Sequence, residues 1–424
     1  MKARWLIGLV GFTCSWLVAS DAGARTWHIK PDGTGDAPTI VDAVFAASSG
    51  DTILLAPGTY SGLGNFGIDT LGLSLTFTSE TGPESTIIDC QGLGPGFWIA
   101  DGSAVISGIT VENGKDWEGN PGAGIRGARV ITNCIVRNNH SDSRGGGIYC
   151  WAPATVSKNV VVNNTAQVGG GIYFEGNVVV TENTVIGNTA EMAGGGICGE
   201  SSAGFVATVS RNTVKGNSSM YEAGGIAAGG YVVFTENVVC DNTAWAGAGI
   251  LCQSRATLTN NVIYGNCAQT RGGGILCDGP QAKILGNTVC ENSAPQGAGI
   301  AFERDGDYAQ VERTIIAFNT QGPGVECFDG TTPGWFFCCD IFGNEGGNAI
   351  CPCEQRDNFS LDPQFCGILG TGNYQLQSDS PCAPGNHPAG ANCELIGARP
   401  VLCGEVKAER KTWGNVKSLY KKND

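Results

Sequence analysis

The sequence predicts an all-β fold, a right-handed parallel β-helix solenoid of about 10–12 coils with about 25 residues in each. A Gly-Gly/Ala-Gly-Ile phrase returns every 23 to 29 residues, from residues 122–125 to residues 297–300. An asparagine pair with members five residues apart recurs with the same period. A repeat of this length indicates one supersecondary unit that is stacked many times. Glycine supplies 66 of the 424 residues and charged residues only 15%, which suits a tightly stacked solenoid.

Each repeat predicts three short strands joined by tight corners. In residues 169–193 the apolar stretches are brief and β-branched, and none has the length or period of a helix. Connections between parallel strands are almost always right-handed, which sets the hand of the coil. Asparagine suits a corner because it tolerates the left-handed backbone region and its amide can hydrogen-bond up the stack. The expected corner residues are Asn133/Asn138, Asn159/Asn164, Asn183/Asn188, Asn212/Asn217, Asn237/Asn242, Asn261/Asn266 and Asn287/Asn292, with Asn113, Asn319 and Asn344 extending the series.

Four segments are expected along the chain. Residues 1–24 read as a signal peptide, with Lys2 and Arg4 before an apolar run and a small-residue cleavage site that ends at Ala24. The β-helix is assigned to residues 25–350, a Cys-rich C-terminal cap to 351–404, and a basic amphipathic tail to 405–424. The tail is either a short docked helix or a sorting handle. The protein is therefore expected to be secreted, extracellular or held on the outer cell surface.

The cysteines predict disulfides. Export to an oxidising compartment permits them, and nine cysteines crowd into residues 327–403. With only three histidines in the chain, a disulfide-stapled cap that covers the open end of the solenoid is favoured over a metal cluster. Cys252 and Cys277 occupy the same position in successive repeats, so we expect them to lie one coil apart and to form a disulfide.

Charge narrows the choice of partners. The formal net charge of −14 argues against nucleic acid. It also disfavours polyanionic sugars, unless local basic residues or bound cations intervene. No segment after the signal peptide is long and apolar enough to span a membrane.

Residues 28–60, from His-Ile-Lys-Pro-Asp-Gly to Pro-Gly-Thr-Tyr, resemble the opening of the pectin lyase-like β-helix superfamily. The resemblance implies a short helix at about residues 40–47 that caps the first coil. It covers 33 residues and bears on the fold alone. The catalytic signatures of polygalacturonases, alginate epimerases, pectate lyases and pectin methylesterases are all missing from the sequence, so no catalytic residue is carried over.

The repeats are similar to those of polymorphic outer-membrane proteins. Residues 235–250 follow the Asn-x-Ala, then Gly-Gly-x-Ile rhythm of those surface β-helices. This resemblance implies an adhesin-like surface protein. The membrane β-barrel that ends such proteins would not fit within this chain, so the resemblance points to a secreted or surface-held relative.

One corner of the coils offers a candidate binding site. Aligning the repeats puts Tyr221 and Trp245 at the same corner of adjacent coils, with Glu222 and Arg271 at the next position. Two aromatic rings one coil apart, flanked by an acid and a base, would suit a sugar ring. The plainer interpretation is that these rings only cover the coil edge, as isolated surface aromatics often do. Trp117 and Trp151 are weaker candidates.

Three functions stay open. The first is binding or adhesion to a glycan or another surface component without catalysis or cofactor. The second is a polysaccharide lyase or glycoside hydrolase, with calcium possible for a lyase. For an enzyme, Asp241 and Glu291 at equivalent corners two coils apart form the best available pair of carboxylates. The third is a purely structural surface protein.

Overall fold

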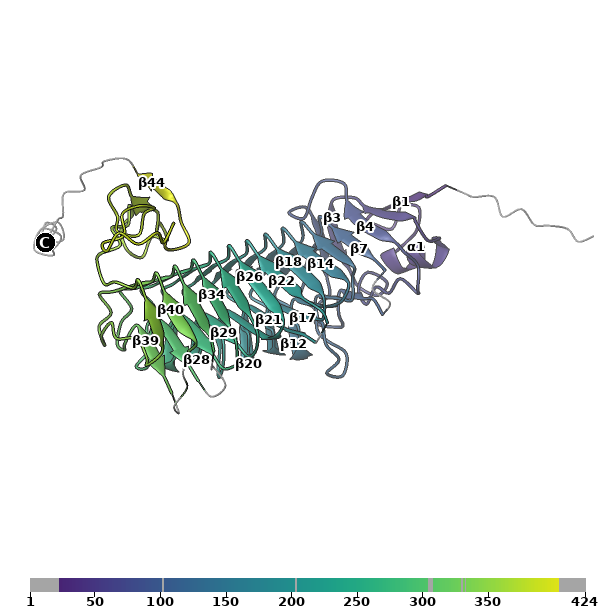
Figure 1. The fold of residues 1–424 in the computed structure, drawn as a ribbon. Helices are drawn as coiled ribbons and strands as arrows, with labels where there is room; N and C mark the ends of the chain where they lie inside the picture. Colours follow the sequence, from purple (N-terminus) through teal and green to yellow (C-terminus); the bar gives the residue numbers. More distant parts are fainter. Residues whose placement is uncertain are drawn as a thin grey trace, which may run out of the picture.

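The computed structural model describes residues 23–100, 103–202, 204–303, 308–328, 331 and 333–403. Figure 1 shows one long solenoid whose coils lie side by side, with the last segment of the chain packed on its flank. The expected basic tail and most of the expected signal peptide lie outside the described residues. Within the described residues, no helix has the length and hydrophobicity needed to cross a membrane.

Four parallel sheets, here named A to D, form the walls of the solenoid. Sheet A contains β1 (Thr26–Ile29), β2 (Thr52–Leu55), β4 (Thr76–Ser79), β7 (Val105–Ser107), β10 (Val130–Thr132), β14 (Ala154–Ser157), β18 (Val178–Thr181), β22 (Ala207–Ser210), β26 (Val232–Thr235), β30 (Thr257–Thr259), β34 (Lys283–Leu285), β37 (Gln310–Glu312), β40 (Trp335–Phe337) and β42 (Glu354–Arg356). Sheet B contains β3 (Gly58–Ser61), β5 (Thr86–Asp89), β8 (Thr110–Glu112), β11 (Ile135–Arg137), β15 (Val160–Val162), β19 (Thr184–Ile186), β23 (Thr213–Lys215), β27 (Val238–Cys240), β31 (Val262–Tyr264), β35 (Thr288–Cys290), β38 (Ile315–Ala317) and β41 (Asp340–Phe342).

The other two sheets are shorter. Sheet C contains β6 (Phe97–Trp98), β9 (Ile125–Arg126), β13 (Ile148–Trp151), β17 (Ile172–Glu175), β21 (Ile197–Ser201), β25 (Ile226–Gly230), β29 (Ile250–Cys252), β33 (Ile275–Cys277), β36 (Ile300–Phe302) and β39 (Val325–Cys327). Sheet D contains β12 (His140–Arg144), β16 (Thr165–Val168), β20 (Thr189–Ala193), β24 (Ser218–Ser219), β28 (Thr243–Ala246) and β32 (Cys267–Arg271).

The parallel β-helix is confirmed, with two corrections. Sheet A has fourteen strands, so the described chain makes more coils than the 10–12 expected. The first coils lack the glycine phrase and the asparagine pairs, which is why the repeat undercounts them. The six coils that contribute to sheet D have four strands instead of three, because polar stretches such as Thr165–Val168 pair along the axis although their outward residues are exposed.

The glycine phrase closes the corner between sheets D and C. Gly169 has a φ of +66°, and a Cβ on Gly170 would lie 2.3 Å from the carbonyl oxygen of Thr189 in the next coil. A side chain at either position would therefore disturb the stacking. The isoleucine that follows opens eight of the ten strands of sheet C and is buried in the central core, as Ile148 and Ile172 show.

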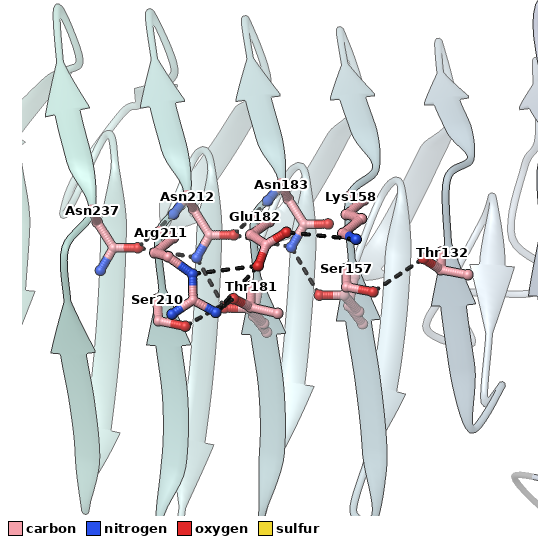
Figure 2. A network of polar contacts seen from close by, with 12 residues as sticks. Thr132, Ser157, Lys158, Thr181, Glu182, Asn183, Ser210, Arg211, Asn212 and Asn237 are labelled. Atoms are coloured by element: carbon pink, nitrogen blue, oxygen red, sulfur yellow. Dashed lines mark hydrogen bonds and ion pairs between the residues drawn. The ribbon is translucent and has the colours of Figure 1, made fainter.

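Two asparagine ladders line the corners on either side of sheet B. In the first, Asn212 Oδ1 accepts from the Asn183 amides, and Asn212 Nδ2 donates to Asn237 Oδ1 at 3.0 Å (Figure 2). The second ladder runs through Asn164, Asn188 and equivalent residues up to Asn344. These side chains are almost completely buried, so each amide replaces hydrogen bonds that water would otherwise supply.

Three predicted ladder members were misplaced by one residue. Asn113, Asn133 and Asn138 have φ values of 52–57° and lie just before the ladder positions, which are Gly114, Cys134 and Asn139. At each corner the left-handed backbone therefore belongs to the preceding residue, and the ladder asparagine points inward.

The two ends of the solenoid differ in the segments that lie against them. Helix α1 (Ile40–Ala46) is close to the predicted helix and buries Ile40, Ala43 and Val44 in the core of the first coils. At the other end, Phe359 still bridges to Asp340, so the solenoid extends past the predicted boundary at residue 350.

The Cys-rich segment holds three disulfides, Cys327–Cys351, Cys338–Cys393 and Cys366–Cys403. The segment also contains the small sheet of β43 (Leu376–Gln377) and β44 (Val401–Cys403). It packs Tyr374, Leu376 and Ile396 against outward residues of sheet B such as Val262 and Ile315. Figure 1 shows this position on the flank. The expected stapling is confirmed. Ile350, Cys351 and Cys353 pack against the central core at the end of the solenoid, whereas the later part of the segment covers the side of the last coils.

The expected disulfide between Cys252 and Cys277 is absent. The two residues are register partners in sheet C and lie buried in the core as free thiols. Their Cβ atoms project in parallel from strands about 4.8 Å apart, whereas a disulfide needs Cβ atoms about 3.8 Å apart. Adjacency was therefore correctly predicted, and the bond was not.

Candidate functional site

The predicted aromatic pair lies where the repeat placed it. Glu222 bridges to Ala246, so Tyr221 and Trp245 are neighbours on adjacent coils of the sheet D wall. Both are exposed, at 60% and 50%. Met192 precedes them in the same row, because Ala193 bridges to Glu222. Its side chain is also exposed. We call this exposed apolar row the ridge.

The predicted acid and base do not flank this ridge as a pair. Glu222 and Arg271 both align with Ala246, so they lie two coils apart. Arg271 Nη2 is 2.7 Å from Glu303 Oε1, and both side chains are largely buried. This ion pair turns the guanidinium away from the ridge and toward sheet C.

Asp241 and Glu291 do not converge on an open cleft. Asp241 forms an exposed ion pair with Lys215 at 3.4 Å. Glu291 lies beneath the Cys-rich segment, where the Tyr374 hydroxyl donates to its Oε2 at 3.3 Å. Burial raises the pKa of Glu291, but the cause is the packed segment above it. The two carboxylates therefore have separate structural partners.

A stronger constellation lies on the outer face of sheet C, in the coils nearest the N-terminus. Trp98, Arg126, Tyr149 and Tyr173 are successive register partners on β6, β9, β13 and β17. Their side chains form one continuous row because they occupy the same position in each coil. We call this row, together with Trp117 and Trp151, the Arg126 cleft, a name for these neighbouring residues and not for a measured cavity.

Arg126 lies among aromatic rings. Its guanidinium carbon is 3.9 Å from the Trp98 ring centroid and 5.7–5.8 Å from those of Tyr149 and Trp151. The Trp117 ring adds a further wall, 5.7 Å from Trp98. Cation–π contacts of this kind hold the guanidinium in place over the ring faces.

Glycines and a buried carboxylate hold the two tryptophans in place. A Cβ on Gly94 would lie 2.7 Å from Trp117 Nε1, and one on Gly127 would lie 2.5 Å from the Trp151 ring. Next to Trp117, Asp116 Oδ2 accepts from the Ser141 hydroxyl and from the Asp142 amide at 2.9 Å. Any side chain at these glycines would push the rings outward, so the backbone is shaped to them.

The electrostatics of Arg126 are unusual. In the described part of the chain the guanidinium has no acidic partner, and its Nε and Nη1 are buried without a hydrogen-bond acceptor. Burial lowers the pKa of Arg126, yet an arginine stays charged near neutral pH. A buried, unsatisfied donor costs about 1–3 kcal/mol, and more when charged. Such groups in native proteins are explained by a bound water or ion, by stored strain or by a functional role.

The cleft has an acidic flank. Trp151, Glu175 and Glu200 are register partners at the outer edge of sheet C. Glu175 Oε1 accepts from Arg144 Nη1 at 3.1 Å. Glu175 and Glu200 also line a depression of about 400 Å3 together with Ser201, Ser202, Gln253 and three glycines. The cation, the aromatic rings and the acceptors therefore lie along one surface of sheet C.

The sequence reasoning named Trp117 and Trp151 only as weaker candidates and missed Arg126 and Trp98. The signal was present in the residue that follows the isoleucine of each glycine phrase. That residue is Arg126, Tyr149 and Tyr173 in successive repeats, and the phrase-like Gly94-Pro95-Gly96-Phe97 precedes Trp98 in the same way.

Comparisons with known proteins agree on the architecture. The family model described as "Right handed beta helix region" matches residues 71–239 and 219–363. No curated protein matches the sequence significantly.

Similar solved structures include pectate lyase Pel9A, at 13% identity and a TM-score of 0.47, with 89% of this chain and 96% of that chain covered. The A-module of the Azotobacter vinelandii mannuronan C-5 epimerase AlgE4 is also similar, at 18% identity and a TM-score of 0.46, with 76% of this chain and 94% of that chain covered. The PL6 family alginate lyase AlyGC is similar at 14% identity and a TM-score of 0.48, with 89% of this chain and 59% of that chain covered. Likeness at this level carries no argument about activity or substrate.

Proposed function

The chain belongs to the right-handed beta helix family, and we propose that it binds an acidic glycan in the Arg126 cleft without catalysis. The proposal is argued from the surface, because this fold does not determine activity. The ligand is a polysaccharide that carries a carboxylate on some of its sugars. Export and a cell-surface or extracellular location form part of this proposal, since the three disulfides suit an oxidising compartment.

The observation that carries the proposal is the unpaired guanidinium of Arg126. Its Nη2 is not among the buried unsatisfied atoms, so this nitrogen is the edge that a carboxylate can approach. A charge-assisted hydrogen bond to an arginine is among the strongest contacts available to a uronate. The tryptophan rings would cover the apolar face of the same sugar.

The acidic flank sets the type of glycan. Glu175 and Glu200 can accept hydrogen bonds from sugar hydroxyls, as carboxylates do. They would repel a polymer with a carboxylate on every residue, because like charges close together are unfavourable. The cleft therefore suits a glycan in which acidic sugars alternate with neutral ones.

Cleavage by a lyase is the alternative. Proton transfer near neutral pH needs a group with a pKa close to that pH. Burial raises the pKa of Tyr149 to about 12, with Glu175 adding to the shift, so this phenol is poorly suited as a base. Among the described residues, one group of three potential metal ligands lies close together, Cys338, Asp357 and Cys393, and its two cysteines form a disulfide. Calcium is a possible cofactor only if the protein is a lyase.

The test compares three proteins with xanthan as an acidic glycan and dextran as a neutral one. Arg126→Met keeps the packing of the arginine stem, and the exposed Arg211→Met is the matched control. We expect xanthan to bind the native protein and the control alike, and the Arg126 variant roughly tenfold or more weakly, in line with one charged hydrogen bond.

The length of the polysaccharide after incubation separates the alternatives. Unchanged chains together with Arg126-dependent binding support the proposal. Shortened chains with unsaturated ends would establish a lyase. Equal binding to both variants would remove Arg126 from the account, and absent binding together with self-association would favour a structural surface protein. Trp117→Ala, at an exposed position, repeats the test if Arg126→Met folds poorly.

A further inference from the structure

A second groove crosses the outer face of sheet A in the last coils. It has a volume of about 590 Å3, and its lining includes Tyr231, Arg255, Lys283, Gln310 and Trp335. We call it the basic groove. It shares no residue with the Arg126 cleft, which lies on sheet C and in earlier coils.

The groove follows the solenoid axis. Thr257, Lys283, Gln310 and Trp335 are successive register partners on β30, β34, β37 and β40. Arg255 lies two residues before Thr257, so its side chain lies beside this row and not within it. Polar groups therefore recur at the coil spacing of about 4.8 Å, a distance comparable to the length of a sugar ring.

The charge of the groove is opposite to that of the protein. Arg255 and Lys283 line it, and none of its described lining residues is a carboxylate, although the formal net charge of the chain is −14. Arg255 Nη1 donates to the Tyr231 hydroxyl at 2.8 Å, which orients the guanidinium. Neither cation has an acidic partner in the described residues. A local positive field of this kind attracts anions despite an acidic surround.

An aromatic side chain at one end of the groove is fixed in advance. Trp335 Nε1 donates to Glu312 Oε1 at 3.0 Å, and the indole stacks on Phe337 with ring centroids 5.6 Å apart. Because its orientation is already set, the indole would lose little conformational freedom on binding a sugar face.

We propose that the basic groove is a second glycan site, which binds a linear anionic polysaccharide with charged groups at Arg255 and Lys283 and one sugar ring on Trp335. Because the described lining holds two cations and no carboxylate, this site accepts a denser charge than the Arg126 cleft. The site does not depend on the proposed function of that cleft. With both sites filled, one molecule links two glycan chains from different faces, and both contacts gain avidity where the two chains belong to one connected polymer surface.

The test uses the full exported chain and four polymers: polygalacturonate and dextran sulfate as anionic glycans, dextran as a neutral glycan, and polyglutamate as an anion without sugar rings. Arg255→Ala/Lys283→Ala removes the two cations. The matched control, Lys158→Ala/Arg211→Ala, removes two exposed cations beside Glu182 on another part of the surface.

We expect the groove variant to bind at least one anionic glycan roughly tenfold or more weakly than the control does, and with a smaller loss of affinity on adding salt. Trp335→Leu should weaken glycan binding and leave any polyglutamate binding unchanged. Arg126→Met should retain binding to the groove.

Two results would overturn the inference. The first is equal affinity of the groove variant and the control for both anionic glycans. The second is polyglutamate binding as tight as glycan binding. If Arg126→Met alone abolishes all glycan binding, the groove proposal fails while the proposed function stands. If the groove variant loses binding and Arg126→Met does not, the reverse holds.

Discussion

Replacing Asn212 by alanine should break the first asparagine ladder at its centre. The side chain is 1% exposed and makes four hydrogen bonds: Oδ1 accepts from the backbone and side-chain amides of Asn183, and Nδ2 donates to Val180 O and Asn237 Oδ1. Alanine leaves two donors of Asn183 and one carbonyl without partners. At about 1–3 kcal/mol for each group, and with partial relief by an entering water, the free energy of unfolding should fall by about 3–6 kcal/mol.

The assay is urea unfolding followed by tryptophan fluorescence, with hydrogen exchange to locate the loss. A solenoid can open coil by coil, so exchange should rise most for amides in the coils that contact Asn212. Asn177→Ala is the matched control, because Asn177 is exposed in a turn and should change stability by less than about 0.5 kcal/mol. A loss below about 1 kcal/mol for Asn212→Ala, or exchange unchanged around residue 212, would refute the ladder as a source of stability.

Three further outcomes are expected. Burial raises the pKa of Asp340 to about 7, so the folded protein holds this proton more tightly than the unfolded chain does. The free energy of unfolding should therefore fall as pH rises from about 4 to about 7, and Asp340→Asn should remove that part of the pH dependence. An unchanged pH dependence in the variant would contradict this. Cys338→Ser/Cys393→Ser should make the segment after residue 360 easier to proteolyse by roughly tenfold while the coils stay folded, and coil cleavage at the same rate would contradict this. Tyr221→Ala/Trp245→Ala should leave xanthan affinity within about twofold if these rings only cover the coil edge, and a larger loss would place the ridge in the binding site.

The solenoid could be predicted from sequence because its physics is repetitive. Most coils after the first few bury an isoleucine, turn at a glycine and satisfy an asparagine amide, so the same residues return at the same spacing. The corner errors at Asn113, Asn133 and Asn138 arose because a left-handed residue and a ladder residue are adjacent, and asparagine suits both. The position of the Cys-rich segment could not be predicted, because it depends on apolar outward residues of sheet B that are not part of the repeating pattern.

The candidate sites show the same division. Tyr221 and Trp245 were found because they are conspicuous in aligned repeats, but the predicted acid and base do not flank their row as a pair. The Arg126 cleft depends on non-repeating choices at one repeated position, where arginine and tyrosine in early coils give way to alanine and leucine in later ones. Its closure by Trp117 also depends on how the long loop before Gly122 folds back over Gly94, and loop paths are not set by the repeat.

Binding in the Arg126 cleft is tested most directly by a crystal structure of the protein soaked with an acidic oligosaccharide from xanthan. We expect a sugar carboxylate within hydrogen-bonding distance of Arg126 Nη2 and a sugar ring against Trp117 or Trp98, with the oligosaccharide intact. Ligand density elsewhere, with the Arg126 cleft empty at a concentration that saturates binding in solution, would contradict it.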